Sequence, residues 1–277
     1  MQRLQQVKEE KAMKKLLSVV LAIVCLLAIT GFGSRADKDE LSARREAPTE
    51  KVLRVGTTAD YPPFAYYQEA SKTHIGFDVE LMRGLAREMG YDKVEFVNTG
   101  FHDLLPSLQE GKVDAVISCM TVTDERRKEA DFTASYLEGV QSAVVAPFGT
   151  DSRNADDMKD KRIAVEAGSV HENQAKQYSG TVIECANAEE ALHLVLDKKA
   201  DFAVMDNYTA RFYIANFYRD RLHLMTELPG NKENGVGIAV AKGNKEMLDK
   251  LNVALQNYRD TAAYHQVKRS YFGRLEV

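Results

Sequence analysis

Residues 118–126 read Ser118-Cys-Met-Thr-Val-Thr-Asp-Glu-Arg126, and the rest of the sequence is organised around them. They follow Asp114-Ala-Val-Ile-Ser118, a short apolar run that is typical of a buried strand. Beyond that strand, backbone N–H groups, a hydroxyl and the Arg126 guanidinium come within a few residues. This combination suits a carboxylate, because arginine can donate to both of its oxygens. Alternatively, residues 123–126 form only the cap and first turn of a solvated helix.

The segments before this stretch alternate between strand and helix patterns. Two strands and two helices are predicted at 52–56, 77–89, 94–97 and 102–110. The order β-α-β-α-β predicts a parallel sheet covered by helices, and such sheets bind ligands beyond the carboxyl ends of their strands. The loops after these strand ends lie at 57–64, 100–101 and 119–126. We expect them to meet at one edge of the sheet, which favours a binding role for Arg126.

The alternation starts afresh after residue 140, which indicates a second sheet domain set inside the chain. Strands are predicted at 140–146, 162–165, 181–184 and 202–205, and helices at 156–161, 170–178, 188–196 and 207–215. An extended run and two helices follow at 235–241, 244–258 and 262–271. The sequence therefore predicts an α/β fold with two lobes, each a mostly parallel sheet flanked by helices, and a ligand in the cleft between them. The predicted domains are lobe 1 at 52–138 and 233–277 and lobe 2 at 139–232, connected near 137–142 and 230–236.

The N-terminal part of the chain differs from the rest. Lysines precede an apolar run at about 16–32, which is typical of a secretory signal peptide over residues 1–36, and translation can equally begin at Met13. A transmembrane anchor is the alternative, although the run is near the short limit for spanning a bilayer. Residues 37–51 are charged and almost free of large apolar side chains, so we expect a flexible leader. These features predict export to the periplasm or the cell surface, with tethering if the leader is not cleaved.

Composition excludes several classes of function. The chain has 277 residues, of which 44% are hydrophobic, so it can bury a sizeable core. Its formal charge is −4, so the basic footprint of a nucleic-acid-binding protein is absent. Three cysteines, of which Cys25 lies in the apolar run, do not define a disulfide framework. Six scattered histidines show no metal-ligand spacing. Neither a metal nor another cofactor is predicted.

Six segments carry a more specific pattern. They are Val55-Gly-Thr-Thr-Ala-Asp-Tyr-Pro-Pro-Phe64, Gly76-Phe-Asp-Val-Glu-Leu81, Leu104-Leu-Pro-Ser-Leu-Gln-Glu-Gly-Lys-Val-Asp114, Met120-Thr-Val-Thr-Asp-Glu-Arg126, Phe132-Thr-Ala-Ser-Tyr136 and Lys199-Ala-Asp-Phe-Ala-Val-Met-Asp206. In this order they resemble the solute-binding proteins of polar amino-acid ABC transporters, which have the type 2 periplasmic binding fold. The resemblance spans about residues 52–274. It implies a monomer that captures a free polar or cationic L-amino acid between its lobes and delivers it to a membrane permease.

The resemblance also implies how the amino-acid backbone is held. The α-carboxylate is expected at Arg126, at the Thr121 amide and at the amides of Ser169 and Val170, which lie at a predicted helix N-terminus. The α-ammonium is expected at Asp206, the Thr121 hydroxyl and the Cys119 carbonyl. Alternatively, Asp206 caps the helix that starts at residue 207.

The ligand side chain is expected between Tyr61 and Phe101, unless these rings only fill the core. Thr58 is also expected at the ligand side chain, at a position where relatives that select basic amino acids often have an acidic residue. Glu166, at the end of a predicted strand, is expected to face the pocket, where it can pair with a cation or remain protonated and donate a hydrogen bond. Its alternative role is that of a solvated carboxylate at a strand end.

Two other classes of function remain open from the sequence. A periplasmic dehydratase of the prephenate or arogenate type has a similar scaffold, and Glu166 or Asp206 could act in it as a general acid if burial raised the pKa. No acid/base pair is evident, and Arg126 with Asp206 already fits a zwitterion. The sensing domain of a receptor or channel would need a transmembrane or signalling segment after it, and none follows in this sequence.

Overall fold

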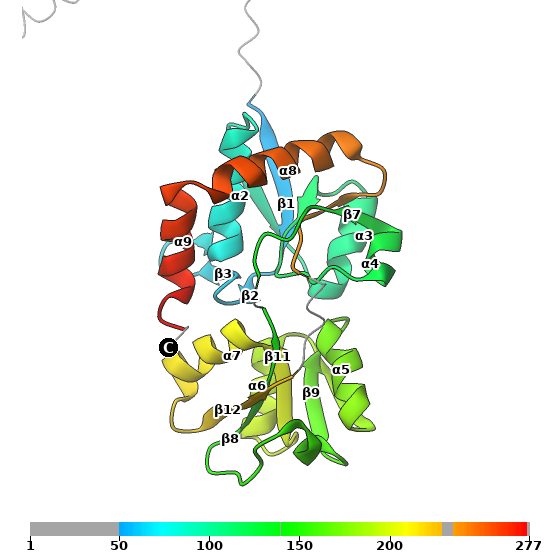
Figure 1. Cartoon of the computed structure of the whole chain (residues 1–277), viewed down its shortest axis with the longest axis vertical. Coiled ribbons are helices and arrows are strands. Elements are labelled where there is room, and N and C mark those ends of the chain that lie inside the picture. Colours follow the sequence, from blue (N-terminus) through cyan, green and yellow to red (C-terminus); the bar gives the residue numbers. More distant parts are fainter. Residues whose placement is uncertain (1–49, 139, 229–234, 276–277) are drawn as a thin grey trace, which may run out of the picture. The chain divides into compact units, whose positions relative to one another are not determined.

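A computed structural model describes residues 50–138, 140–228 and 235–275 of the chain. The predicted signal peptide, and the leader as far as residue 49, lie outside these residues. Within the described ranges, no helix is long and apolar enough to cross a membrane. The described residues form two five-stranded sheets and a small three-stranded one, with helices on the large sheets (Figure 1).

The first large sheet combines N-terminal strands with one strand from near the C-terminus. Its strand order is β5, β1, β6, β13 and β7, with bounds Lys93–Asn98, Val52–Thr57, Ala115–Val116, Ala239–Ala241 and Ala130–Phe132. Strands β5, β1 and β6 are parallel, whereas β13 is antiparallel to both of its neighbours. Its helices are α2 (Phe77–Glu88), the 3₁₀ turn η1 (Phe101–Asp103), α3 (Leu104–Gln109), α4 (Asp124–Glu129), α8 (Lys245–Arg259) and α9 (Ala262–Phe272). We call this sheet with its helices lobe 1.

Both faces of the lobe 1 sheet are buried. The side chain of Ala115 joins a cluster with Leu85 of α2, whereas that of Val116 joins another cluster with Leu108 of α3. Successive side chains of a strand point to opposite faces, so a strand covered on both sides is apolar throughout. Helices α2, α8 and α9 pack against one another, and α3 packs on β1, β6 and β13 (Figure 1).

The second large sheet, with its helices, forms lobe 2. Its strand order is β10, β9, β11, β8 and β12, with bounds Thr181–Cys185, Arg162–Glu166, Phe202–Asp206, Ser142–Pro147 and Leu222–Glu227. Strands β10, β9 and β11 are parallel, and β8 is antiparallel to both β11 and β12. Its helical segments are η2 (Ala155–Met158), α5 (Val170–Tyr178), α6 (Ala188–Leu196), α7 (Asn207–Tyr213) and the π-helical turn η3 (Ile214–Tyr218). The parallel strands of each lobe agree with the predicted fold class.

Two connections join the lobes. One runs from Leu137 towards β8, and the other follows β12 and reaches lobe 1 at Gly235, with residues 229–234 outside the described part. Val236 forms isolated antiparallel bridges with both Thr121 and Leu137. The two connections therefore lie side by side where they meet lobe 1. A hairpin sheet, β2 (Asp60–Tyr61), β3 (Ala65–Gln68) and β4 (Thr73–Ile75), follows β1.

Strands β7 and β12 lie where the sequence pattern predicts none. Strand β7 has three residues directly after α4, which is too short for an alternating pattern. Strand β12 is at a sheet edge, and its register shifts between Leu224 and Thr226, which interrupts the alternation on which a sequence prediction depends. The predicted strand at 114–118 is also shorter in the structure, because only Ala115 and Val116 form ladder pairs.

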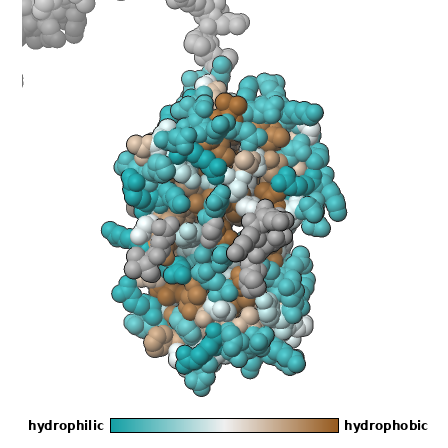
Figure 2. All heavy atoms as spheres, in the orientation of Figure 1, coloured by the Kyte–Doolittle hydropathy of each residue, from teal (hydrophilic) through white to brown (hydrophobic). Residues whose placement is uncertain are grey.

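The surface shown in Figure 2 is mostly hydrophilic, with hydrophobic residues in small separate areas. The large hydrophobic side chains that are exposed come from four different elements or loops, namely Tyr67, Phe148, Phe217 and Val253. Single exposed hydrophobic residues are normal on a soluble domain and do not identify an interface.

Close packing between α2 and α8 leads to a first prediction. A Cβ added at Gly84 would lie 2.5 Å from Cζ of Tyr258, which is buried. We expect Gly84→Ala to lower the free energy of unfolding by about 1–3 kcal/mol, because the helices must move apart. Chemical denaturation of the two proteins measures this difference. The same substitution in a Tyr258→Leu background should cost less, and equal stability of Gly84→Ala and the parent protein would show that the contact is tolerated.

Candidate functional site

A small cavity lies between the lobes. It is lined from lobe 1 by Tyr61, Phe101, Ser118, Cys119, Thr121 and Arg126, and from lobe 2 by Glu166, Ser169, Val170, His171 and Asp206. Every predicted site residue except Thr58 is among them. The cavity has a volume of about 20 Å³, which is room for about one water molecule. A free amino acid therefore needs either a wider separation of the lobes or a movement of the lining side chains.

Arg126 lies in α4, the short helix that follows the β6 loop. The Thr123 hydroxyl accepts a hydrogen bond from the Arg126 amide, so residues 123–126 do form a helix cap. The guanidinium nevertheless reaches the cavity, donating from Nη1 to the Thr121 carbonyl at 2.7 Å and from Nη2 to the Gly168 carbonyl of lobe 2 at 3.0 Å. Its Cζ lies 5.1 Å from the centre of the Phe101 ring. The capping and binding roles are therefore compatible.

The surroundings of Arg126 act on its pKa in two opposite directions. Burial lowers its pKa to about 10, while nearby acidic groups, first Asp206 and then Glu166, act to raise it. The group remains a cation at neutral pH. A guanidinium has five N–H donors and two are used here, so three remain for a ligand carboxylate.

Asp206 lies at the end of β11 and points into the cavity. Its Oδ2 accepts a hydrogen bond from the Tyr61 hydroxyl at 2.7 Å, and the Cys119 Sγ is 3.5 Å from the same oxygen. The side chain makes no capping hydrogen bond to α7, so the capping alternative is wrong. Tyr61 and Cys119 belong to lobe 1 and Asp206 to lobe 2, and these contacts therefore cross between the lobes.

Glu166 is a buried carboxylate at the end of β9, with 6% of its surface exposed. Its side chain makes no hydrogen bond to any residue that the structure describes. Burial, and after it the charges of Asp60 and Asp206, raise its pKa to about 8 against the opposing effect of Arg126. Burial also raises the pKa of Asp60, while nearby polar groups limit that rise. The strand-end carboxylate is thus enclosed rather than solvated.

The lobe 2 turn at 166–170 differs in detail from its predicted geometry. Ser169 and Val170 occupy the N-cap and first position of α5, as expected. The Ser169 amide, however, donates to the Glu166 carbonyl at 3.2 Å, and its hydroxyl donates to the same carbonyl at 2.7 Å. Ser169 therefore holds the turn that presents Glu166, and a ligand carboxylate would have to compete for its amide.

Thr58 does not line the cavity but lies directly behind one of the residues that do. Its hydroxyl is 3.0 Å from the hydroxyl of Ser118, and its amide donates to the same atom at 3.3 Å. Thr58 is buried. It therefore positions Ser118, which lies two residues beyond the carboxyl end of β6.

His171 and Ser118 line the cavity but are absent from the set predicted from sequence. The His171 Nε2 is 3.6 Å from Asp206 Oδ1, and its Nδ1 is 2.9 Å from the Ser142 hydroxyl. Ser142 in turn donates to the Gln174 side chain. Nothing in the local sequence marks this histidine, because its contacts come from strands distant in the chain. Ser118 had a local signal in the sequence, since it ends the predicted strand at 114–118 and begins the stretch at 118–126.

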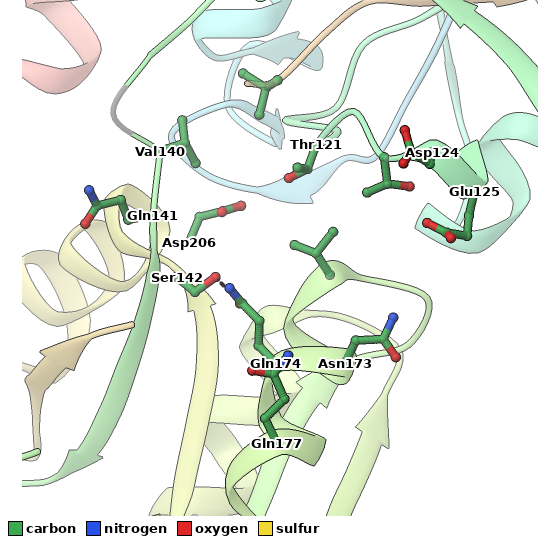
Figure 3. A pocket seen from close by; sticks show the side chains of 13 residues that line it. Thr121, Asp124, Glu125, Val140, Gln141, Ser142, Asn173, Gln174, Gln177 and Asp206 are labelled. Atoms are coloured by element: carbon green, nitrogen blue, oxygen red, sulfur yellow. Dashed lines mark hydrogen bonds between the residues drawn. The ribbon is translucent and has the colours of Figure 1, made fainter. Parts of the chain in front are cut away.

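A larger pocket of about 520 Å³ opens beside the cavity and shares Thr121, Val170 and Asp206 with it. Figure 3 shows Asp206 and Thr121 on facing sides of this pocket, with Asn173, Gln174 and Gln177 projecting from α5. Its remaining lining comes from α4 with its cap residue, from the two connections between the lobes and from Ser142 at the start of β8. The charged side chains of Arg126, Glu166 and Asp206 meet at the smaller cavity, which we take as the centre of the site.

The arrangement suits a zwitterion with an additional positive charge. Arg126 offers donors to a carboxylate and Asp206 offers acceptors to an ammonium group. Glu166 offers a second carboxyl group, whose raised pKa a nearby cation would lower, favouring its charged form. Among the described residues, no group of three His, Cys, Asp or Glu side chains is placed to hold a metal ion. The two described cysteines, Cys119 and Cys185, are buried free thiols.

Comparison with known proteins places this site in context. A family model described as bacterial extracellular solute-binding proteins, family 3, matches residues 53–274. The arginine-binding extracellular protein ArtP of Bacillus subtilis is 30% identical over 265 residues, which covers 94% of this chain and 98% of ArtP. A probable histidine-binding protein of Campylobacter jejuni is 33% identical over 207 residues, covering 73% of this chain and 78% of that protein.

The solved structures agree with the sequence relatives. An ancestral arginine-binding protein bound to arginine superposes with a TM-score of 0.75 at 35% identity, covering 80% of this chain and 98% of that one. The same ancestral protein has been solved with glutamine, with the same TM-score, identity and coverage. These matches confirm the predicted two-lobed α/β fold.

Proposed function

Because the chain belongs to family 3 of the bacterial extracellular solute-binding proteins, we propose that it binds a free cationic L-amino acid, with arginine as the first candidate. The ligand lies between the two lobes, and the protein carries it to the permease of an ABC transporter. One observation carries the choice of a cation: Glu166 is buried beside the cavity without a hydrogen-bond partner among the described residues. A cationic side chain would supply that partner.

The charge balance of the site supports the same conclusion. Arg126 is one cation near three carboxyl groups, and the charges of two of them, Asp60 and Asp206, act to raise the pKa of the third, Glu166. An amino-acid zwitterion adds one charge of each sign, so it leaves the acidic excess in place. A guanidinium or ammonium on the ligand side chain reduces that excess. Opposite charges within a few ångströms favour the charged forms of both partners.

Each backbone group of the ligand then has its own partner. Arg126 and the Thr121 and Val170 amides hold the α-carboxylate, and Asp206 with Thr121 and Cys119 holds the α-ammonium. Tyr61 and Phe101 enclose the aliphatic part of the side chain, and Glu166 and Asp60 face its charged end. Because lobe 1 and lobe 2 both contribute, the ligand makes more contacts when the lobes are together than when they are apart, which drives closure.

The same family membership supports a wider proposal. Lobe 1 extends over 52–138 and 233–277 and lobe 2 over 139–232, and the paired connections at Leu137 and Val236 act as the hinge. The protein works as a monomer outside the cytoplasmic membrane, after export directed by residues 1–36. It performs no chemistry on its ligand.

Thermal unfolding in the presence of single amino acids tests the proposed ligand. The protein is first unfolded and refolded to remove any carried-over ligand, and then heated with each of the twenty amino acids, ornithine, citrulline and cystine. L-Arginine at about 100 times its dissociation constant should stabilise the protein by roughly 2.7 kcal/mol. A shift in midpoint with arginine, and none with alanine or glutamate, is the expected result.

Citrulline provides the matched ligand control, since it has the shape of arginine without the charge. We expect its affinity to be at least ten times lower than that of arginine. Equal shifts with both compounds would overturn the cationic assignment while leaving amino-acid binding intact. No shift with any amino acid would overturn the proposed function.

The dehydratase hypothesis has less support, because the relatives described above are named as binding proteins. A direct assay distinguishes a binding protein from a dehydratase. Incubation of the purified protein with prephenate should leave the compound unchanged beyond its spontaneous decay, whereas a dehydratase would consume it.

A further inference from the structure

Asp78 is a buried carboxylate that none of the roles above uses. It is the second residue of α2 and has no exposed surface. Its Oδ2 accepts a hydrogen bond from the Cys119 amide at 2.7 Å and one from the Tyr136 hydroxyl at 3.0 Å. Its Oδ1 has no hydrogen-bond partner among the described residues. Burial raises its pKa to about 7, although the two hydrogen bonds oppose the rise.

The residue that Asp78 holds has an unusual backbone conformation. Cys119 has φ = 45°, in the left-handed region that residues other than Gly, Asn and Asp seldom adopt. This conformation turns the Cys119 amide towards Asp78 and leaves the Sγ 3.5 Å from Asp206 Oδ2. Ser118 and Thr121, on either side, line the same cavity. The hydrogen bond from Cys119 to Asp78 therefore fixes the peptide segment that faces Asp206.

Asp78 also acts on the site through its charge. The Asp206 carboxylate contributes to the raised pKa of Asp78, and both carboxylates help to raise the pKa of the Cys119 thiol after burial itself. The position proposed for the α-ammonium is thus flanked by one carboxylate in lobe 2 and a second one behind Cys119 in lobe 1. A buried carboxylate with an unpaired oxygen is unfavourable by itself, and a cation close by relieves part of that cost.

We infer that Asp78 is a positioning residue for the ligand α-ammonium: it fixes the Cys119 peptide, and its charge adds to that of Asp206. This inference rests on the proposed function, since it concerns the amino group of an amino-acid ligand. A purely structural role for Asp78 is the competing explanation. It predicts that the loss of Asp78 affects all ligands of the site equally.

Two ligands separate these explanations. They are L-arginine and 5-guanidinopentanoate, which is arginine without its α-amino group. We expect Asp78→Asn to weaken binding of L-arginine by ten-fold or more and binding of 5-guanidinopentanoate by less than three-fold, measured by isothermal titration calorimetry. Asparagine keeps the size of the side chain, and its Oδ1 can still accept from Cys119, so the comparison isolates the charge.

Tyr136→Phe is the matched control, because it removes the other donor to Asp78 Oδ2 and leaves the carboxyl group in place. Losing this hydrogen bond raises the pKa of Asp78 further, so both variants are compared at pH 8, above the Asp78 pKa of about 7. Tyr136→Phe should change both affinities by less than three-fold. Equal weakening of the two ligands by Asp78→Asn would support the structural role and overturn the inference, as would unchanged binding of both. If Asp78→Asn does not fold, Asp78→Ser removes the charge with a smaller side chain and is tested with the same ligands.

Failure of the inference can be distinguished from failure of the proposed function. Should the parent protein bind another amino acid but not arginine, the proposed ligand is wrong, and the same comparison is made with that amino acid and its deaminated analogue. Should the parent protein bind no amino acid, both proposals are overturned.

Discussion

Replacing Arg126 by alanine is expected to weaken amino-acid binding by at least 100-fold, or about 2.7 kcal/mol. Arg126 is the only arginine or lysine that lines the cavity within the described part of the chain, and its guanidinium is the proposed partner of the ligand carboxylate. Removing one partner of a buried, hydrogen-bonded charge pair typically costs about 2–5 kcal/mol. Titration calorimetry with the amino acid that gives the thermal shift measures the loss.

Arg127→Ala provides the control for this substitution. Arg127 lies in the same helix, carries the same charge and is exposed, so its removal changes the net charge equally without altering the cavity. We expect near-normal affinity in Arg127→Ala. Asp206→Ala should abolish binding as Arg126→Ala does, because it removes the proposed ammonium partner. Affinity within three-fold of the parent protein in either Arg126→Ala or Asp206→Ala would overturn the assignment of the site.

Replacing Glu166 by glutamine is expected to stabilise the protein above neutral pH and to weaken its binding of arginine. The Glu166 pKa is about 8 in the folded protein, against an ordinary value of 4.5. Between these values the folded protein keeps a proton that the unfolded chain has released, so the contribution of Glu166 to stability falls as pH rises from about 4.5 to 8. Glutamine remains neutral throughout. At pH 8, Glu166→Gln should therefore raise the free energy of unfolding by an amount on the order of a few kcal/mol.

Binding of arginine should show the opposite dependence on pH. As pH rises from 6 to 9, Glu166 loses its proton and attracts the ligand guanidinium more strongly, so the affinity should rise in the parent protein and rise less in Glu166→Gln. Denaturation and calorimetry over this range measure both effects. Glu88→Gln, at an exposed position of α2, is the control and should change neither quantity. Identical pH profiles for the parent protein and Glu166→Gln would refute the role of Glu166.

The site shows which contacts can be predicted from a sequence. Arg126, Cys119 and Thr121 were predictable because they lie within one short stretch after a strand, and the order of strands places that stretch at the cleft. Asp206 follows a strand in the same way. The lining of the cavity by these residues depends on topology, which the alternation of strands and helices already indicates.

Contacts between side chains of different lobes were not predictable. The hydrogen bond between Tyr61 and Asp206 joins residues separated by 145 positions, and the approach of His171 to Asp206 depends on how α5 packs beside β11. Thr58 illustrates the opposite error, since its place in the loop suggested the ligand, whereas its hydroxyl is directed to Ser118. No local sequence pattern indicates where such a side chain points, because its direction depends on how the surrounding elements pack.

The direct contacts between the lobes also have a kinetic consequence. Tyr61 with Asp206, and Arg126 with the Gly168 carbonyl, already hold the two lobes to each other at the cavity proposed to take the ligand. Association then has two steps, separation of these pairs followed by capture of the ligand. At high ligand concentration the observed rate of binding is set by the first step and no longer increases with concentration. The same contacts that complete the site therefore also limit how fast it can fill.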